Sequence, residues 1–474
     1  MKKVSKIIAL LCMAALLFGV VACAGTPATT DSGNTQDPND SATQENTPTP
    51  SGPNVDPPAD RVHLVYSLWG GPQEEATMQE TLDEFNNSQD RIWVTALSIP
   101  NEEYATIIQT MATGGNMPDV GMANENLIIG WAREGMLLRE DLFAGADDRP
   151  LEYLAFRDGG DVVAWSQANE VLALWFDRDK FNDAGVEFPP TTMDTAWTWD
   201  EMIEVAKQLT FDADGNTPND AGFNKDNIVQ YGVYVNQWTW QLEAWSLSNG
   251  GRWFSEDGTQ VIFDDAAIEA IQKVFDLNLV HNVAPYIPGT EDTGWWSSLG
   301  AGNVAMTTEG QWATGFTGDT DLDYGVAVLP YMKQLKTLAT GGAVVIWGGT
   351  KHPDEAREFY DWFTDTENNF GIIEAGWWMP TLQSWYQEPL LTRWIDDVAV
   401  RARLPADAYR TAIKDVALDT NVTHPAAWYY TPYTLEIINN IMSPALVEAV
   451  NGSKTVKEVI EDIRPAMEAA LAGP

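Results

Sequence analysis

Apolar and polar positions beyond residue 60 follow the two periods that distinguish strands from amphipathic helices. A helix beginning at Pro72 would place Met78, Leu82 and Phe85 on one face, and residues 102–113 show the same spacing. Short apolar runs flank these helices, and the expected strands cover residues 62–69, 91–99 and 119–123. This alternation predicts an α/β fold with a parallel sheet and helices on both of its faces.

A second series of alternating elements begins near residue 171. Thr198 and Glu201 form a capping-box sequence, which predicts a helix that runs through Leu209. Pro353 suits the first position of another helix, which would turn Phe359 and Phe363 toward a core. Further strands are expected at 171–176, 230–235, 304–307, 324–329 and 343–347, with helices between 437 and 471. The 474 residues, at about 150 per domain, would form two or three domains.

The charge of the chain excludes one large class of partner. Asp and Glu number 69 against 27 Lys and Arg, which gives a formal net charge of −42. A surface this acidic repels phosphodiester backbones, so we expect no nucleic-acid partner. The only cysteines are Cys12 and Cys23, so neither a disulfide framework nor a cysteine zinc site is expected in the folded body. The 21 tryptophans exceed what a core alone demands, and they suggest ligand contacts.

The N-terminus has the pattern of a secretion signal. Three lysines precede an apolar stretch from Ile7 to Ala22, which is too short for a comfortable transmembrane helix of about 20 residues. Val20-Val-Ala-Cys23 resembles the bacterial lipobox, in which the signal is cut before the cysteine and the thiol receives a diacylglycerol. The alternative is an ordinary signal peptide in which Cys23 has no role. We predict a lipoprotein signal peptide at residues 1–22.

The segment after Cys23 has the composition of a tether. Residues 24–60 contain no aromatic side chain and are rich in Thr, Pro, Ser, Asn and Asp, so they are expected to be disordered. We predict a lipidated Cys23 and a flexible tether over residues 23–60. The folded body would then be held at the extracellular face of a bacterial cytoplasmic membrane.

Five segments, in order, resemble the solute-binding proteins of carbohydrate ABC transporters, the maltose-binding-protein-like family. No single motif among them is decisive, but the match runs from about residue 61 to the C-terminus. The segments are 171–209 (VLALWFDRDKFNDAGVEF and the residues that follow), 299–312 (LGAGNVAMTTEGQW), 324–330 (YGVAVLP), Gly341-Gly342 and 352–359 (HPDEAREF). The chain departs from the family pattern at Phe176-Asp177, where Tyr-Asn is frequent, which puts a polar hinge contact there in doubt.

This resemblance implies a two-lobe fold of the periplasmic-binding-protein type II, with a hinge and a cleft between the lobes. Carried onto this sequence, lobe one is residues 61–173 plus 344–390, and lobe two is residues 174–343 plus 391–474. The resemblance further implies an oligosaccharide ligand, separate ABC permease subunits as partners, no required cofactor and a monomer. In the family, the tryptophan of the Gly-x-Trp block commonly stacks on a sugar, and that residue is Trp312 here.

Tryptophan and carboxylate side chains suit a sugar because a pyranose has apolar C–H faces and a rim of hydroxyls. Trp199, Trp362 and Trp394 lie in helical stretches and are expected in the core. Indoles beside Gly or polar residues at strand ends are the candidates for stacking. Together with polar and glycine neighbours they give the expected ligand-binding set: Trp69, Glu74, Asn124, Trp238, Trp240, Trp245, Glu309, Trp312, Gly342, Trp377 and Trp378.

Several members of this set have a second interpretation. Glu74 lies in the first turn of a helix, where a carboxylate also suits the helix dipole. Trp238, Trp240 and Trp245 cannot all share one face of a helix or strand. Trp295 and Trp296 cannot point the same way in an extended chain, so one of them is expected to pack internally. Gly342, with Gly341, would either let the backbone approach a ligand or flex at the crossing between the lobes.

A loop rich in acidic residues could hold a structural calcium ion. Oxygen-bearing groups recur as in an EF-hand-like loop, and the candidate ligands are Asp212, Asp214, Asn216, Pro218 through its carbonyl, and Asp220. Gly215 is misplaced for that loop, and Phe223 stands where a bidentate Glu is needed. The alternative is a turn of Asp, Asn and Gly without metal.

Three classes of function remain open. The first is a receptor that binds an oligosaccharide outside the cell and passes it to a permease, and it breaks no bond. Permease and ATPase would be other chains, because this sequence has no GxxxxGK[ST] motif. The second is a secreted glycoside hydrolase with a pair of carboxylates in a Trp-lined cleft. The third is an adhesin or scaffold lipoprotein without a site for a small ligand.

Overall fold

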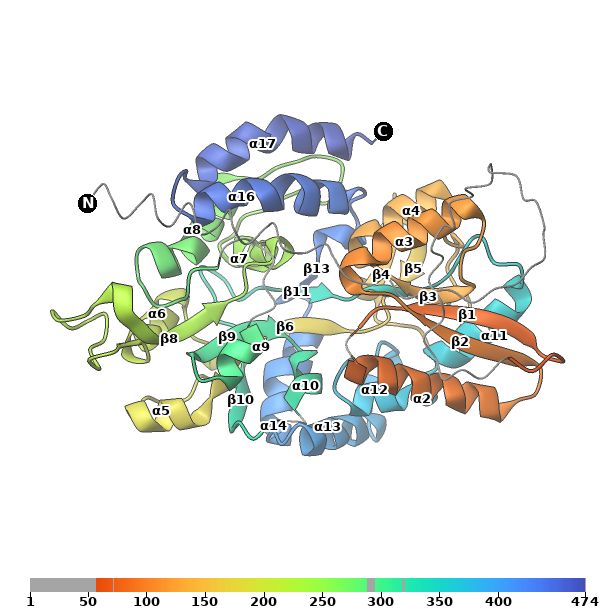
Figure 1. Cartoon of the computed structure of the whole chain (residues 1–474), viewed down its shortest axis with the longest axis horizontal. Helices are drawn as coiled ribbons and strands as arrows, with labels where there is room; N and C mark the ends of the chain where they lie inside the picture. The colour runs from red at the N-terminus through yellow and green to blue at the C-terminus, as the bar shows by residue number, and fades with distance from the viewer. Residues whose placement is uncertain (1–56, 71, 288–294, 318–319, 474) are drawn as a thin grey trace, which may run out of the picture. The chain divides into compact units, whose positions relative to one another are not determined.

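The computed structural model describes residues 57–70, 72–287, 295–317 and 320–473 (Figure 1). These residues belong to one compact unit, 48–474. The predicted signal peptide, Cys23 and nearly all of the predicted tether lie outside the described residues, as do the side chains of Trp295 and Trp296. Within the described part of the chain, no helix has the length and apolar content that crossing a bilayer requires.

A four-stranded sheet contains the first strands of the described chain, in the order β12-β3-β1-β2. Its strands are β1 (Val62–Leu68), β2 (Ile92–Ser98), β3 (Val120–Ala123) and β12 (Ala343–Ile346). β1 is parallel to both β2 and β3, with Val62 opposite Ile92 and Tyr66 opposite Val120. β12 joins the edge antiparallel to β3. The parallel βαβαβ order predicted from the sequence is therefore confirmed.

Helices cover both faces of this sheet. The alternation along β1 turns Leu64, Tyr66 and Leu68 toward α2 (Pro72–Ser88) and α11 (Pro353–Thr364). Trp69 contacts Tyr104 of α3 (Asn101–Gly114), which lies on the opposite face (Figure 1). Phe359 and Phe363 are buried, as their spacing predicted.

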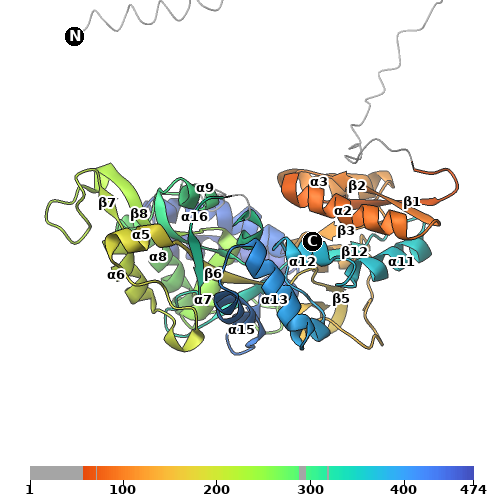
Figure 2. The ribbon, with the colours of Figure 1, turned by 90° about the horizontal axis from the view of Figure 1, so that it is seen from below.

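A second sheet in the described chain has seven strands, in the order β13-β11-β6-β9-β8-β7, with β10 paired to β6. Its strands are β6 (Glu170–Asp177), β7 (Phe211–Asp212), β8 (Ile228–Val235), β9 (Val304–Gly310), β10 (Tyr324–Ala327), β11 (Thr337–Thr340) and β13 (Thr423–Pro425). β8 and β9 are parallel, whereas β6 is antiparallel to β9, β10 and β11. This sheet is thus mixed. Figure 2 shows β6 between the elements of the two sheets.

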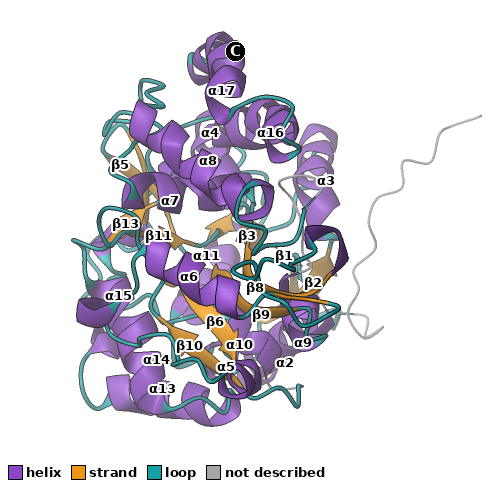
Figure 3. Cartoon of the chain, turned by 90° about the vertical axis from the view of Figure 1, so that its left-hand side faces the viewer, coloured by secondary structure: helices purple, strands orange, loops and turns teal. Residues whose placement is uncertain are grey.

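The helices that surround the second sheet begin with α6 (Trp199–Gln208). Thr198 accepts a hydrogen bond from the Glu201 amide, and Glu201 accepts one from the Thr198 amide, so the predicted capping box is confirmed. α8 (Asp265–Leu279) packs against α17 (Val456–Leu471) and α16 (Ser443–Val450), as Figure 3 shows. The other helices here are α5 (Arg178–Ala184), η3 (Met193–Thr195), η4 (Lys225–Asn227), η5 (Thr239–Gln241), α7 (Leu242–Ser248), α9 (Trp295–Gly300), α10 (Ala313–Phe316), η9 (Ala427–Tyr429) and the π-helix η10 (Leu435–Met442).

The chain passes between the two sheets more than once. After η1 (Glu125–Leu127), α4 (Ile128–Glu134), η2 (Glu152–Leu154) and the hairpin β4 (Ala155–Asp158) and β5 (Asp161–Trp165), it enters the second sheet at β6. It returns through Gly341 and Gly342, which join β11 to β12. It leaves the first sheet again through α12 (Phe370–Glu374), η7 (Gln383–Tyr386), α13 (Leu390–Arg401), α14 (Ala406–Tyr409), the π-helix η8 (Arg410–Lys414) and α15 (Asp415–Leu418). The residue limits proposed for the two lobes stay a prediction.

Candidate functional site

Three partly exposed indoles gather at the end of the second sheet. Trp238 follows β8, Trp240 lies in η5, and Trp312 follows β9. The ring centroids of Trp238 and Trp240 are 5.9 Å apart, and those of Trp240 and Trp312 are 6.1 Å apart. Trp240 also packs edge-on against the buried Trp428, at 5.5 Å. The fold therefore brings together three of the predicted stacking residues, which we call the indole cluster.

A buried carboxylate supports the indole cluster from inside the protein. Glu309 is 0% exposed, and it accepts hydrogen bonds from Asn236 Nδ2 at 2.8 Å, Gln241 Nε2 at 3.2 Å and its neighbour's amide, Gly310 N, at 2.9 Å. Burial raises the pKa of Glu309 to about 7, although these three hydrogen bonds favour the charged form. Glu309 was predicted to touch ligand directly. That prediction is wrong for this structure, because the carboxylate is enclosed by the donors it holds.

Gly310 gives Trp312 its position. A Cβ atom on Gly310 would lie 2.1 Å from Cζ3 of the Trp312 ring. The indole therefore folds back over the backbone of its own strand, where only a glycine leaves room. The glycine of the Gly-x-Trp block thus has a packing role.

Trp69 is a partly exposed indole that directly follows β1 of the first sheet. Its ring packs edge-on against Tyr104, with centroids 4.9 Å apart, directly after β1 ends. A Cβ atom on Gly342 would lie 3.2 Å from Cη2 of Trp69 and 2.7 Å from the carbonyl oxygen of Ala123. The close approach predicted for Gly342 is thus toward Trp69 and β3. Trp69, Trp240 and Trp312 all pack against one hydrophobic cluster that includes residues of both sheets.

Carboxylates lie beside Trp69 and at the crossing between the sheets, where the chain enters β6 and returns through Gly341 and Gly342. The Glu74 carboxyl folds over Gly70, where an added Cβ atom would lie 2.6 Å from Oε2. Glu170 accepts a hydrogen bond from the Thr340 hydroxyl at 3.3 Å. Burial raises the pKa of Glu74 to about 7, and burial together with the charges of Glu125 and Glu74 raises that of Glu170 to about 8. Burial also raises the pKa of Glu125.

The ionisation of these carboxyls has a consequence for ligand chemistry. Glu74, Glu125 and Glu170 remain partly exposed, although the surrounding protein removes much of their hydration. Near neutral pH, Glu74 and Glu170 exchange between an acid that donates and a carboxylate that accepts. Both forms can bond to hydroxyl groups. Glu74 lies in the first turn of α2, so the alternative role at the helix dipole stays open.

Unpartnered amide oxygens lie on both sides of the crossing. Asn124 Oδ1, the predicted contact after β3, is buried and has no hydrogen-bond partner among the described residues. The same holds for Gln167 Oε1, and for Gln237 Oε1 beside Trp238. The carbonyl oxygen of Gly342 accepts from the Ser166 hydroxyl at 3.0 Å and from Gln167 N at 2.9 Å. The Gly342 carbonyl is therefore already engaged within the protein.

Three predicted contacts are buried in the structure. Trp245 is 1% exposed and packs against Trp199 at 4.8 Å, because its place in α7 turns it toward α6. Trp377, 7% exposed, lies over Gly315 and packs edge-on against Phe316. Trp378, 3% exposed, packs against Phe363. As ligand contacts, these three residues are corrected to packing positions.

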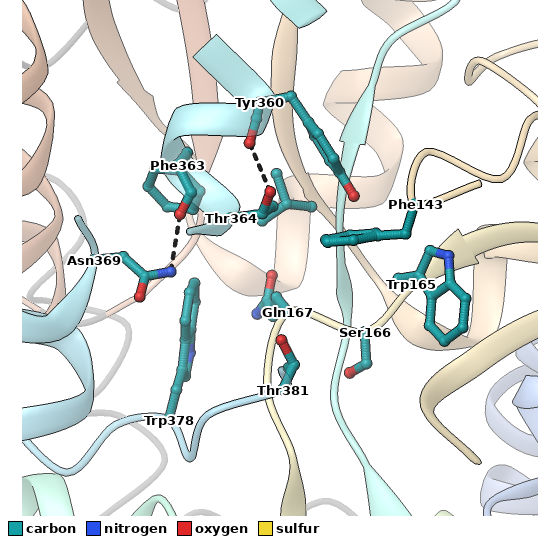
Figure 4. Close-up of a pocket in the computed structure, with 11 residues that line it drawn as sticks. Phe143, Trp165, Ser166, Gln167, Tyr360, Phe363, Thr364, Asn369, Trp378 and Thr381 are labelled. Atoms are coloured by element: carbon teal, nitrogen blue, oxygen red, sulfur yellow. Dashed lines mark hydrogen bonds between the residues drawn. The ribbon is translucent and has the colours of Figure 1, made fainter. Parts of the chain in front are cut away.

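A small pocket adjoins Trp378 (Figure 4), and no residue of the indole cluster lines it. Asn369 Nδ2 donates to the Phe363 carbonyl at 2.9 Å, and the Thr364 hydroxyl donates to the Tyr360 carbonyl at 2.8 Å, so part of its polar wall is satisfied internally. The pocket is lined by Phe143, Trp165, Ser166, Gln167, Val344, Tyr360, Phe363, Thr364, Asn369, Trp378 and Thr381. None of the partly exposed tryptophans described above lines it.

The acidic loop after β7 is held by its own hydrogen bonds. Asp212 Oδ1 accepts from the amides of Asp214 and Asn216, and Oδ2 accepts from Asn224 N at 2.8 Å. Asp220 Oδ2 accepts hydrogen bonds from both the amide and the hydroxyl of Thr217. Among the described residues, no group of three His, Cys, Asp or Glu side chains could hold a metal ion. The hydrogen bonds are those of a turn of Asp, Asn and Gly, and calcium binding by this loop stays a prediction.

The sequence interpretation missed several polar residues of the site. Glu125 directly follows the predicted Asn124, and Glu170 begins a strand at the crossing. Asn236 and Gln237 lie between the end of β8 and Trp238. Their position between a strand end and an indole is the signal that could have identified them. Asp177, where a hinge contact was in doubt, caps α5 by accepting from the amides of Asp179 and Lys180.

Comparison with curated proteins gives distant but consistent relatives. The maltotriose-binding protein of Pyrococcus abyssi is 24% identical over 311 residues, which cover 62% of this chain and 60% of that protein. A maltooligosaccharide ABC transporter solute-binding lipoprotein of Streptococcus pneumoniae is 24% identical over 270 residues, covering 53% of this chain and 57% of that protein. The chain therefore matches less than two thirds of the length of these relatives.

Solved structures share the fold over most of this chain. An ABC substrate-binding protein of Listeria monocytogenes in complex with cycloalternan has a TM-score of 0.71 at 20% identity, covering 87% of this chain and 100% of that one. The maltose/maltodextrin-binding domain MalE of Bdellovibrio bacteriovorus, bound to maltotriose, has a TM-score of 0.68 at 17% identity, covering 87% and 100%. The predicted two-lobe α/β fold is thus confirmed. A family profile for the bacterial extracellular solute-binding protein matches residues 70–370, and the chain belongs to this family.

Proposed function

We propose that this protein is the extracellular substrate-binding component of an ABC transporter and that it binds a neutral oligosaccharide between its lobes. The observation that carries the proposal is the indole cluster of Trp238, Trp240 and Trp312, together with Trp69 of the first sheet. Indole faces match the C–H faces of pyranose rings, and several faces suit more than one ring. The relatives that bind maltotriose and maltooligosaccharides support this ligand class.

The polar groups of the site would bind the sugar hydroxyls. Glu74 and Glu170 supply carboxyls that can donate or accept, Glu125 supplies a further carboxyl, and Asn124 and Gln237 supply oxygens without partners among the described residues. A ligand that contacts both lobes stabilises the closed state by its additional contacts there. The closed receptor would deliver the sugar to separate permease subunits.

The protein would be anchored by lipid on Cys23, outside the cell. The family is extracellular, and the Streptococcus pneumoniae relatives are lipoproteins, which supports this location. A Cys23→Ala variant expressed in a Gram-positive host should appear in the culture medium, whereas the unmodified protein should sediment with membranes. Retention of the variant on membranes would contradict lipid anchoring.

A saccharide titration tests the proposed function. Maltotriose, maltoheptaose and an unrelated disaccharide are added to the folded protein while tryptophan fluorescence and thermal unfolding are followed. A bound sugar at 100 times its Kd should stabilise the protein by about 2.7 kcal/mol. Saturable binding with intact sugar recovered afterwards supports the receptor. Shortened products at catalytic rates would instead establish the hydrolase, and no saturable binding to a broad sugar panel would favour the adhesin.

A further inference from the structure

The indole cluster depends on a network of hydrogen bonds beneath it, and the network centres on one residue. All three groups that face the Glu309 carboxylate are donors: Asn236 Nδ2 bonds to Oε2, and Gln241 Nε2 and Gly310 N both bond to Oε1. Asn236 cannot reverse its amide at no cost, because its Oδ1 accepts from Trp238 N at 2.9 Å. Only an acceptor at residue 309 satisfies this arrangement.

We propose that Glu309 is a positioning residue for ligand binding, whose ionised carboxylate holds the segment carrying Trp238 and Trp240 in place beside Trp312. This inference rests on the proposed function of the indole cluster. The connection is direct on both sides: Asn236 links Glu309 to the Trp238 backbone, and Gln241 closes η5 directly after Trp240. Gly310 links the same carboxylate to the strand end that precedes Trp312.

Loss of the charge has a defined structural consequence. An amide at residue 309 offers one oxygen and one NH₂ group, so its NH₂ must face either Asn236 Nδ2 or the pair Gln241 Nε2 and Gly310 N. Two buried donors then oppose each other, and the segment has to move to relieve them. A proton on Glu309 also changes the network, because it converts one carboxylate oxygen into an O–H donor. Gln241 Oε1 is buried without a partner among the described residues, so reversal of that amide would let it accept the new O–H group.

The surroundings of Glu309 place this change near neutral pH. Burial raises its pKa to about 7, so the carboxylate predominates above that pH and the acid below it. The groups that face it from β8, η5 and β9 are the neutral Asn236, Gln241 and Gly310. Glu243 of α7, which follows Gln241 by two residues, accepts instead from Ala427 N and so faces η9. The indole cluster should therefore be best ordered above pH 7.

The test measures maltotriose affinity and tryptophan emission of the ligand-free protein from pH 5.5 to 8.5. Wild-type affinity should weaken about tenfold as pH falls through 7, the equivalent of one charge-assisted hydrogen bond. Glu309→Gln should bind at least about tenfold more weakly at pH 8 and lose the part of the pH dependence that Glu309 contributes, while Glu74 and Glu170 still titrate in this range. Gln241→Met keeps the carboxylate but removes one donor, so its transition should move to higher pH. Asp212→Asn, which alters a buried carboxylate in the turn after β7, should leave affinity and profile unchanged.

The outcomes separate this inference from the proposed function. Wild-type affinity and pH profile in folded Glu309→Gln would overturn the positioning role. If Glu309→Gln does not fold, an unshifted profile in Gln241→Met overturns it equally. If the wild-type protein binds no saccharide, the proposed function fails, and emission of the ligand-free protein still decides: a transition near pH 7 that Gln241→Met shifts supports the network, and a flat emission profile contradicts it.

Discussion

Replacement of Gly310 by alanine probes the indole cluster through a single methyl group. The added Cβ atom would lie 2.1 Å from Cζ3, 2.2 Å from Cη2 and 2.3 Å from Cε3 of Trp312. Carbon atoms in favourable contact are about 3.5–4.0 Å apart, so the ring must move by about 1.5 Å or tilt away from the strand. Trp312 is partly exposed, so it can move outward, away from the position that Trp240 now contacts.

Two quantities follow from that displacement. An aromatic stacking contact contributes about 0.5–1.5 kcal/mol, so loss of its geometry should raise the Kd for maltotriose about two- to tenfold. Overpacking a strand end costs about 1–3 kcal/mol, and the outward path of the ring favours the lower end. Titration calorimetry measures the first quantity and urea unfolding the second.

Gly300→Ala provides a matched control. Gly300 ends α9, and a Cβ atom there would meet nothing within 4 Å. This variant should keep the wild-type affinity and gain up to about 1 kcal/mol of stability from its helix propensity. If Gly310→Ala loses stability but binds maltotriose as the wild type does, Trp312 does not contact the ligand, and the indole cluster is not the sugar platform.

Two further predictions concern stability. Burial raises the pKa of Glu243 to about 8, above the value of about 4.5 in the unfolded chain, so the folded protein holds the proton more tightly and loses stability as pH rises from about 5 to 8. The full loss of stability is about 4–5 kcal/mol. Glu243→Gln can still accept from Ala427 N, so its free energy of unfolding in urea should fall less between pH 5 and 8.5 than that of the wild type. An equal fall in both proteins would contradict the assignment to Glu243. For the loop at Asp212, whose hydrogen bonds are those of a turn, melting in EDTA and in millimolar calcium should give the same midpoint, and an increase with calcium would instead support the calcium site.

The sequence predicted the first sheet well because its elements are long and regular. Leu64, Tyr66 and Leu68 recur at every second position of β1, and α2 and α3 carry clear helical spacing. It did not predict β11, β13 or the hairpin β4–β5. These strands have three to five residues, and their pairing is decided by contacts with distant segments, as when Thr337 of β11 pairs with Thr423.

Side-chain direction explains what the sequence could not show about the site. Trp238, Trp240 and Trp312 are partly exposed, but Trp245 turns inward because α7 begins just after η5 and rotates it onto Trp199. Glu309 is preceded and followed by residues that a strand end could turn either way, so composition alone could not distinguish a ligand contact from a buried support. The contact of Trp69, Trp238, Trp240 and Trp312 with ligand stays a prediction.

The row of rings from Trp312 through Trp240 to Trp428 also gives the protein an intrinsic optical signal. Successive centroids are 6.1 Å and 5.5 Å apart, with planes inclined at 49° and 65°. Neighbouring indole transitions at such separations and angles couple as excitons, so this row should contribute to the circular dichroism of the chain together with the pair Trp199 and Trp245 at 4.8 Å. A molecule that reorients the Trp312 ring would then change the circular dichroism of the row without any added label.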